Sequence, residues 1–151
     1  MLYETEGAFS DRYANLLLAV RQDYIDISSN NPIADLPSVT IENLKNIPCI
    51  LVASNEQRTI ERHYYEMTYH FQGEFLYAEN LEEARLLMIG GQGFIPVEGA
   101  KQPGHFGASI SRIPLFCNGE PITRNYCVCW KKDNFGYYVE EFAKLLKQKF
   151  E

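Results

Sequence analysis

Two apolar, strand-like runs of this sequence, residues 48–53 and 75–78, each end in small polar or acidic side chains. In an open parallel sheet the carboxyl ends of strands meet helix N-termini, whose free N–H groups and partial positive charge attract ligands. A third junction of this kind lies at residues 91–94. The same side chains could simply cap the helices, and that role is compatible with ligand binding. The polar candidates at the first two junctions are Ser54, Asn55, Glu79 and Asn80.

Cysteine and histidine do not form a recognisable catalytic or metal-binding motif here. Cys127 and Cys129 make one C-x-C pair, which is a weak zinc signal without a second pair. We expect reduced cysteines that pack as small apolar side chains, with Cys49 in the core. A small α/β enzyme that uses Cys117 or Cys127 remains an alternative. The histidines, none of which lies in a nucleophile motif, are His63, His70 and His105.

The glycines at positions 90–93 do not predict a nucleotide-binding turn. A dinucleotide fingerprint follows a strand and opens a helix, whereas these glycines end a helical pattern and lead into an apolar run at 94–97. The glycine-rich stretch 99–107 is typical of a surface loop. We therefore expect no catalytic residue, no cofactor and no bound metal.

Composition restricts the class of protein further. The chain has 151 residues, of which 46% are apolar, and this is enough for one ordinary core. Its net charge of −6 lacks the basic excess of a nucleic-acid-binding surface, so we expect no binding of DNA by this chain alone. Neither a membrane-spanning run nor a secretory signal is present, which favours a cytoplasmic protein with reduced thiols.

Short strand patterns alternate with helical ones from residue 22 onward, which predicts an α/β fold with an open, mostly parallel sheet and helices on both faces. The central run 48–53 is apolar throughout, as expected of a strand buried on both faces. Thr40 and Asn43 predict the start of a brief helix. The other helices are expected to carry Ile60, Tyr64, Met67 and Phe71 on one face, to begin at Asn80 with Glu83 in a capping box, and to span 137–150.

The order of these features resembles the effector-binding region of LysR-type transcriptional regulators over residues 20–151. No single motif is specific to that family, but the whole series of motifs in this order is. The segments that carry it are ISSNNPIA, VTIENLKNIPCILV, FLYAENLEEARLLMIGGQGFIPV, ISRIPLF, RNYCVCWKKDN and EEFAKLLKQKF.

The resemblance implies a two-lobed fold like a type 2 periplasmic binding protein, with a small inducer held between the lobes. Residues 1–21 would be the tail of the first lobe and a crossover strand, 22–133 the second lobe, and 134–151 a helix that returns to the first lobe. The first lobe would be incomplete, and the helix-turn-helix domain through which the parent binds DNA would be absent. A stand-alone solute-binding protein is the alternative from another class.

The resemblance also implies where the inducer would bind in the second lobe. The matching positions follow the 48–53 strand and surround the turn into the 94–97 strand, and no arginine clamp is evident among them. Together with the strand-end candidates, the expected ligand-binding residues are Ser54, Asn55, Glu56, Glu79, Asn80, Gln92, Gly93 and Phe94.

The last helix predicts self-association. Its expected apolar stripe, Tyr138, Phe142, Leu145 and Leu146, should pack against the missing part of the first lobe. A stripe left open to water promotes pairing with a second copy. We therefore expect a homo-oligomer, most simply a homodimer.

Overall fold

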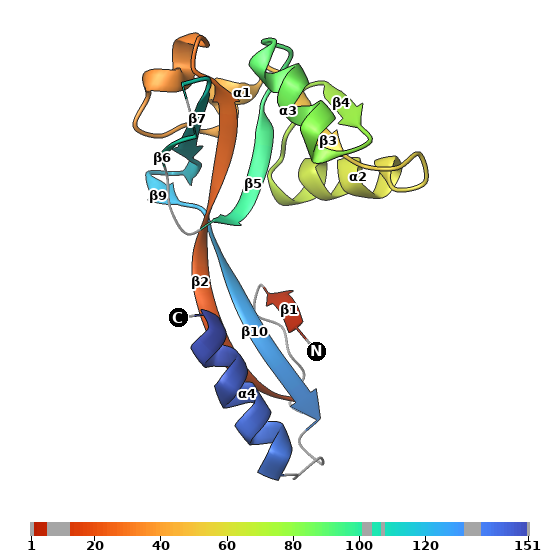
Figure 1. Cartoon of the computed structure of the whole chain (residues 1–151), viewed down its shortest axis with the longest axis vertical. Coiled ribbons are helices and arrows are strands. Elements are labelled where there is room, and N and C mark those ends of the chain that lie inside the picture. Colours follow the sequence, from red (N-terminus) through yellow and green to blue (C-terminus); the bar gives the residue numbers. More distant parts are fainter. Residues whose placement is uncertain (1, 6–12, 101–103, 107, 132–136, 151) are drawn as a thin grey trace. The chain divides into compact units, whose positions relative to one another are not determined.

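A computed structural model describes residues 2–5, 13–100, 104–106, 108–131 and 137–150 of the chain. The chain divides into two compact units (Figure 1). The central unit is Gln22–Ile122, and the terminal unit combines Met1–Arg21 with Thr123–Glu151. That these units correspond to two lobes, with the boundaries expected after residues 21 and 133, stays a prediction.

The central unit is built around two parallel strands. β3 (Cys49–Val52) pairs with β4 (Phe75–Ala78) in parallel register, and a parallel bridge joins Cys49 to Phe94 just before β5 (Ile95–Ala100). The three strands therefore point the same way, with their carboxyl ends at one edge of the sheet. We call this the carboxyl edge, and the opposite one the amino edge.

The remaining strands of this unit pair antiparallel. β2 (Tyr13–Ser28), which runs through both units, pairs with β5 and with β7 (Ile110–Pro114), and β6 (Gly104–Phe106) pairs with β7. The predicted parallel arrangement thus holds at the centre and gives way to antiparallel pairing around it. The short connections from β6 to β7 and from β8 (Phe116–Cys117) to β9 (Glu120–Pro121) allow only antiparallel neighbours. β6 lies within the stretch expected to be a loop.

Helices cover both faces of the parallel strands, as predicted. α3 (Leu81–Ile89) packs Ala84 and Met88 against Ile50 on one face. On the other face Cys49 and Leu51 join a larger core with residues from α1 (Ile41–Leu44) and from α2 (Arg58–Thr68) and the segment after it. β3 is buried on both sides for this reason, which confirms the prediction from its apolar run.

The predicted N-caps of two helices are confirmed. At α1 the Asn43 N–H donates to the Thr40 hydroxyl at 3.3 Å, while the Thr40 N–H donates to the Asn43 side chain at 2.9 Å. At α3 the Glu83 N–H donates to the Asn80 side chain at 2.8 Å. A short 3-10 helix, Pro32–Asp35, begins after Asn31 in the same manner.

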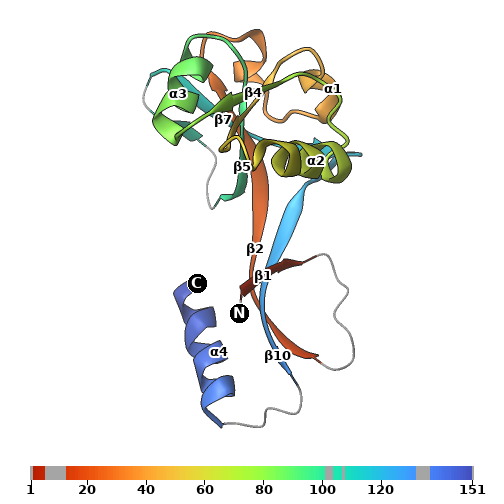
Figure 2. The ribbon, with the colours of Figure 1, turned by 90° about the vertical axis from the view of Figure 1, so that its right-hand side faces the viewer.

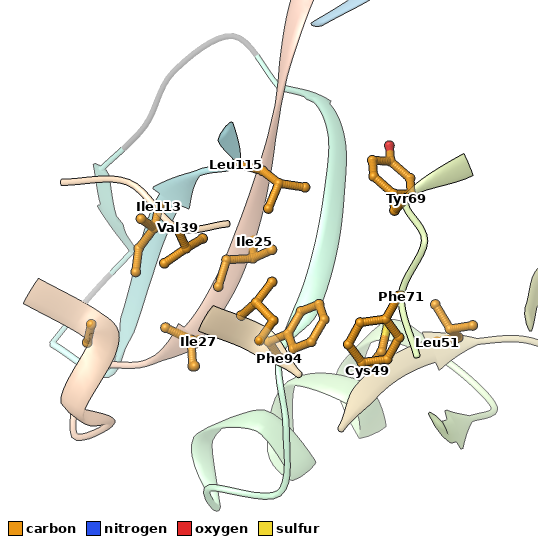
Figure 3. Close-up of a cluster of buried hydrophobic side chains, with 12 residues drawn as sticks. Ile25, Ile27, Val39, Cys49, Leu51, Tyr69, Phe71, Phe94, Ile113 and Leu115 are labelled. Atoms are coloured by element: carbon orange, nitrogen blue, oxygen red, sulfur yellow. The ribbon is translucent and has the colours of Figure 1, made fainter. Parts of the chain in front are cut away.

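The larger core surrounds β2 (Figure 3). Ile25 and Ile27 are completely or almost completely buried, and Phe94 and Phe71 meet edge to face at 5.6 Å beside them. The segment 23–28 is buried on both faces, although it includes the polar residues Asp23, Asp26 and Ser28. Its polar side chains must therefore find partners inside the protein.

The terminal unit is a small layer of strands with one helix. β1 (Leu2–Thr5) pairs antiparallel with β10 (Thr123–Lys131), which is next to β2 in the sheet. α4 (Tyr137–Phe150) packs along these strands through Ala143, which contacts Leu18 and Val128 (Figures 1 and 2). No helix in the described part of the chain combines the length and hydropathy that a membrane crossing requires.

The predicted apolar faces of two helices are only partly buried. In α2, Ile60 and Met67 are 71% and 63% exposed, whereas Tyr64 of the predicted face packs inward together with Tyr65. In α4, Phe142 and Leu145 are each 59% exposed, whereas Leu146 is half-buried and Ala143 is buried. Tyr65 bonds to Glu98 inside the unit, and hydrophobic periodicity does not reveal such a polar partner.

One ion pair fastens β2 to β7. Asp26 and Arg112 lie opposite each other in the strand register, and the guanidinium donates to both carboxylate oxygens, at 2.7 and 2.9 Å. Their side chains are only 9% and 16% exposed. The hydrogen bond to Asp26 raises the pKa of Arg112.

Replacement of Arg112 by Met should destabilise the protein by about 3 kcal/mol, because the Asp26 carboxylate would stay buried without its counter-charge. Urea unfolding followed by circular dichroism measures this. The matched control is Glu42→Gln, which breaks the exposed Lys45–Glu42 pair and should cost less than about 1 kcal/mol. Equal losses in the two variants would contradict a structural role for the buried pair.

Candidate functional site

The eight residues predicted to bind a ligand do not lie together. Five of them follow β3 or β4 and so lie at the carboxyl edge: Ser54, Asn55, Glu56, Glu79 and Asn80. Gln92, Gly93 and Phe94 precede β5, which is parallel to β3, and therefore lie at the amino edge. A single small ligand cannot reach both groups across the length of the strands.

The amino-edge residues have evident structural roles. Phe94 is 3% exposed, and its N–H donates to the Pro48 carbonyl at 2.9 Å. A Cβ built on Gly93 would come within 2.3 Å of that same carbonyl oxygen, so only glycine allows the two backbones to pack this closely. Gln92 is exposed beside them.

The carboxyl edge presents exposed polar side chains. Ser54, Asn55 and Glu56 form the turn between β3 and α2, and their side chains have no intramolecular partner among the described residues. Asn80 is committed to its capping bond, and the Glu79 N–H donates to the Glu83 carboxylate at 2.9 Å. This edge thus has side chains that are free to meet a ligand as well as side chains that hold the helices.

Arg58 is a functional candidate that the sequence analysis missed. It opens α2 directly after the polar turn, and its guanidinium lies over the ring of Tyr77, with 5.0 Å from Cζ to the ring centroid. Its Nε atom is buried and has no hydrogen-bond partner among the described residues. Buried guanidinium N–H groups normally have a hydrogen-bond acceptor. A ligand at this edge would supply the acceptor that Nε lacks. Arg58 is thus an arginine at the edge where the sequence showed no evident arginine clamp.

A second polar cluster lies where β5 ends. The Tyr69 hydroxyl donates to Asp23 at 2.5 Å, and the Tyr65 hydroxyl donates to Glu98 at 2.7 Å. The β2–β5 register shifts here, so that both Glu98 and Gly99 lie opposite Asp23. A β-bulge of this kind changes the direction in which the neighbouring side chains point. The sequence signal that was overlooked is Asp23 itself, an acidic residue inside a buried strand.

Burial controls the protonation of this cluster. It raises the pKa of Glu98, with the neighbouring charges of Asp23 and Glu61 adding to the effect and the Tyr65 hydrogen bond opposing it. Burial and the bonds to carboxylates likewise raise the pKa of Tyr65 and of Tyr69. The tyrosines therefore remain hydrogen-bond donors.

The cavity beside this cluster is too small for a metabolite. Asp23, Tyr65, Tyr69 and Glu98 line it together with apolar residues of the core, and its volume is about 20 Å³. That is room for roughly one water molecule. The cluster holds β2, α2 and β5 together and is not itself a ligand pocket.

The four cysteines differ in exposure. Cys49, Cys127 and Cys129 are buried, whereas Cys117 is exposed on β8. Burial raises the pKa of Cys49, which keeps its thiol protonated and unreactive. Within the described ranges no group of three or more potential metal ligands occurs.

The chain shares its fold with regulatory domains of LysR family regulators. It matches the regulatory domain of MetR from N. meningitidis with a TM-score of 0.69 and 8% identity, over 98% of this chain and 71% of that one. For the BenM effector-binding domain, solved with its effector benzoate, the TM-score is 0.66 and the identity 13%, over 99% of this chain and 68% of that one. For HinK from Pseudomonas aeruginosa the TM-score is 0.64 and the identity 16%, over 99% of this chain and 53% of that one.

These matches confirm the α/β, periplasmic-binding-protein-like class expected from the sequence. Identities of this size show the fold alone. The chain spans about half the length of the longer neighbours, 52% and 53% for two of them. No protein-family model and no curated protein matches the sequence.

The Glu98→Gln variant should change how stability depends on pH. Because the pKa of Glu98 in the folded protein is raised above its ordinary 4.5, protonated Glu98 stabilises the fold. That stabilisation is complete below the unfolded-state pKa and is lost as the pH rises through the raised folded-state pKa. Urea unfolding between about pH 4 and pH 8 should show E98Q gaining stability relative to the parent as the pH rises.

Glutamine keeps an oxygen that accepts the Tyr65 hydroxyl, so packing is conserved in this variant. Glu120→Gln, at an exposed carboxylate of the same unit, is the control and should leave the pH profile unchanged. A constant difference between E98Q and the parent at every pH would contradict the assigned role of burial.

Proposed function

We propose that this chain is the effector-binding region of a LysR-type transcriptional regulator, and that a small molecule binds it at the carboxyl edge. The observation that carries the proposal is the buried Nε of Arg58 at that edge, which has no hydrogen-bond partner in the described part of the chain. It lies within a fold that regulatory domains of that family share. Regulation of transcription in the bacterial cytoplasm, rather than catalysis, is the role that this fold supports.

The chemistry of the edge favours an effector with a carboxylate. A guanidinium forms strong, directional hydrogen bonds to carboxylates. Arg58 is held in place by the Tyr77 ring, and the first N–H groups of α2 add a partial positive charge next to it. Ser54 and Asn55 would then bond the rest of the ligand, while Glu56 and Glu79 would select against a second negative charge.

Regulation would follow from a shift between conformations. An effector changes the balance of two states only if it binds one of them more tightly. In the proposed parent protein, this shift would alter the binding of DNA by a helix-turn-helix domain. This chain would supply the sensing step alone.

The test uses sodium benzoate, the effector in the BenM structure, together with other small mono- and dicarboxylates as probes. At least one should raise the thermal unfolding temperature, since a ligand that binds only the folded state stabilises it. Arg58→Gln should weaken that carboxylate's affinity about tenfold, because it removes a charged hydrogen-bond donor.

Arg85→Gln is the matched control, because Arg85 is an exposed arginine on α3 of the same unit. It should leave the stabilisation unchanged. If no carboxylate stabilises the chain, or if the two arginine variants behave alike, Arg58 is not an effector-binding residue.

We also propose that the chain forms homodimers through α4. Phe142 and Leu145 lie one turn apart on its exposed side, and paired apolar side chains of this size favour association. Leu146 is half-buried within the unit, and the side chain of Tyr138 lies outside the described residues.

The Phe142→Ser/Leu145→Ser double variant should be monomeric at a concentration at which the parent chain is a dimer. Light scattering coupled to gel filtration measures both masses. Ile60→Ser/Met67→Ser, on the exposed side of α2, is the control and should remain a dimer. A monomeric parent chain would refute the proposal directly.

A further inference from the structure

A second hollow lies at the amino edge of the central unit, away from the proposed effector site. Its volume is about 630 Å³, which is within the range of small-molecule sites. Its walls come from the loop after α1, from α2, and from the loop before β4. Its polar and aromatic lining residues are Lys45, Asn46, Arg62, Gln72, Glu74 and Phe75.

The walls of this hollow are fixed by backbone packing. The Cys49 N–H donates to the Glu74 carbonyl at 2.8 Å, which ties the second loop to β3. A Cβ on Gly73 would come within 3.0 Å of the Lys45 carbonyl oxygen and 2.6 Å of the Phe71 ring, so the two loops touch directly. Phe71 in turn meets Phe75 edge to face at 5.2 Å. The hollow is therefore preorganised.

The hollow has positively and negatively charged side chains, and their existing interactions are weak. Among the described residues, Lys45 forms an ion pair only with Glu42, and Arg62 only with Glu66; the four side chains are 42% to 76% exposed. Exposed pairs of this kind contribute little and exchange readily for another anion. The side chains of Asn46, Gln72 and Glu74 have no intramolecular partner among the described residues.

We infer that this hollow binds a small zwitterion of the α-amino-acid type. Its carboxylate would bond to the Arg62 guanidinium, whose Nη atoms remain available beside the Nε that contacts Glu66, and to Lys45. Its ammonium group would bond to Glu74, and the amides of Asn46 and Gln72 would take the remaining hydrogen bonds. The Phe75 ring, over which Arg62 lies at 5.4 Å, gives an apolar wall for the side chain.

The hollow is separate from the proposed effector site. The hollow lies at the opposite ends of β3 and β4 from Ser54 and Asn80, so a ligand here would act as a second signal and would not compete for Arg58. A regulator with both sites would respond separately to an amino acid and to a carboxylate.

The probes are L-leucine, 4-methylpentanoate, which lacks the ammonium group, and isopentylamine, which lacks the carboxylate. Each is titrated to about 10 mM into the ¹⁵N-labelled chain, a range suited to ligands of this size. L-Leucine should shift the amide signals of residues 45–47 and 72–75. Loss of either charged group should weaken binding about tenfold.

Two variants and one control complete the test. Arg62→Gln and Glu74→Gln should each weaken L-leucine binding about tenfold, whereas Arg85→Gln, at an exposed arginine of α3, should not change it. Glu74→Gln should also bring the affinities for L-leucine and 4-methylpentanoate closer together, which a general loss of structure would not do.

Three results would overturn the inference. They are the absence of shifts at about 10 mM L-leucine, equal binding of all three probes, and shifts confined to residues 54–58 and 79–80. The last result would assign amino-acid binding to the carboxyl edge and would leave the proposed function intact.

Discussion

The fold of the central unit depends on a strand that must bury polar side chains on both of its faces. Residues 23–28 of β2 include the polar side chains of Asp23, Asp26 and Ser28, and yet all of these residues are buried. A polar group in the core costs free energy unless it is hydrogen-bonded. Asp26 is matched by Arg112 across the strand pair, and Asp23 by Tyr69 from beyond α2. These partners determine which elements can lie on either side of β2.

This constraint explains why α2 packs as it does. An apolar stripe of Ile60 and Met67 would have left Asp23 and Glu98 buried without the hydroxyl groups of Tyr69 and Tyr65. The helix instead turns its tyrosines inward, where their rings fill the core and their hydroxyls satisfy the carboxylates. The cost is an exposed apolar face, which soluble proteins tolerate when it is small.

The same packing gives the two edges of the sheet different chemistry. At the carboxyl edge, α2 begins with Arg58, which the Tyr77 ring holds beside a turn of uncommitted polar side chains. At the amino edge, the close contact of Gly73 with the backbone of Lys45 brings two loops together around a wide hollow. The two proposed ligands differ because one edge has a guanidinium whose buried Nε has no acceptor among the described residues, whereas the other has groups of both charges.

The sequence by itself determined the features that depend on neighbours along the chain. The capping pairs at Thr40 and Asn80, the buried strand at 49–52 and the α/β order all follow from local hydrogen bonding and local hydrophobicity, which a chain carries wherever it folds. The resemblance to LysR-type regulators rested on that order, and the shared fold confirms it at the level of architecture.

Only the tertiary structure decided which residues meet. Gln92 and Gly93 were grouped with Ser54 in the sequence analysis, but the parallel register of β3 and β5 puts them at opposite edges. The inward faces of α2 and α4 were also fixed in three dimensions, because partners such as Glu98 for Tyr65 come from strands distant in the chain. Periodicity measures how apolar a helix face is, and it contains no information about the polar group that the face will meet.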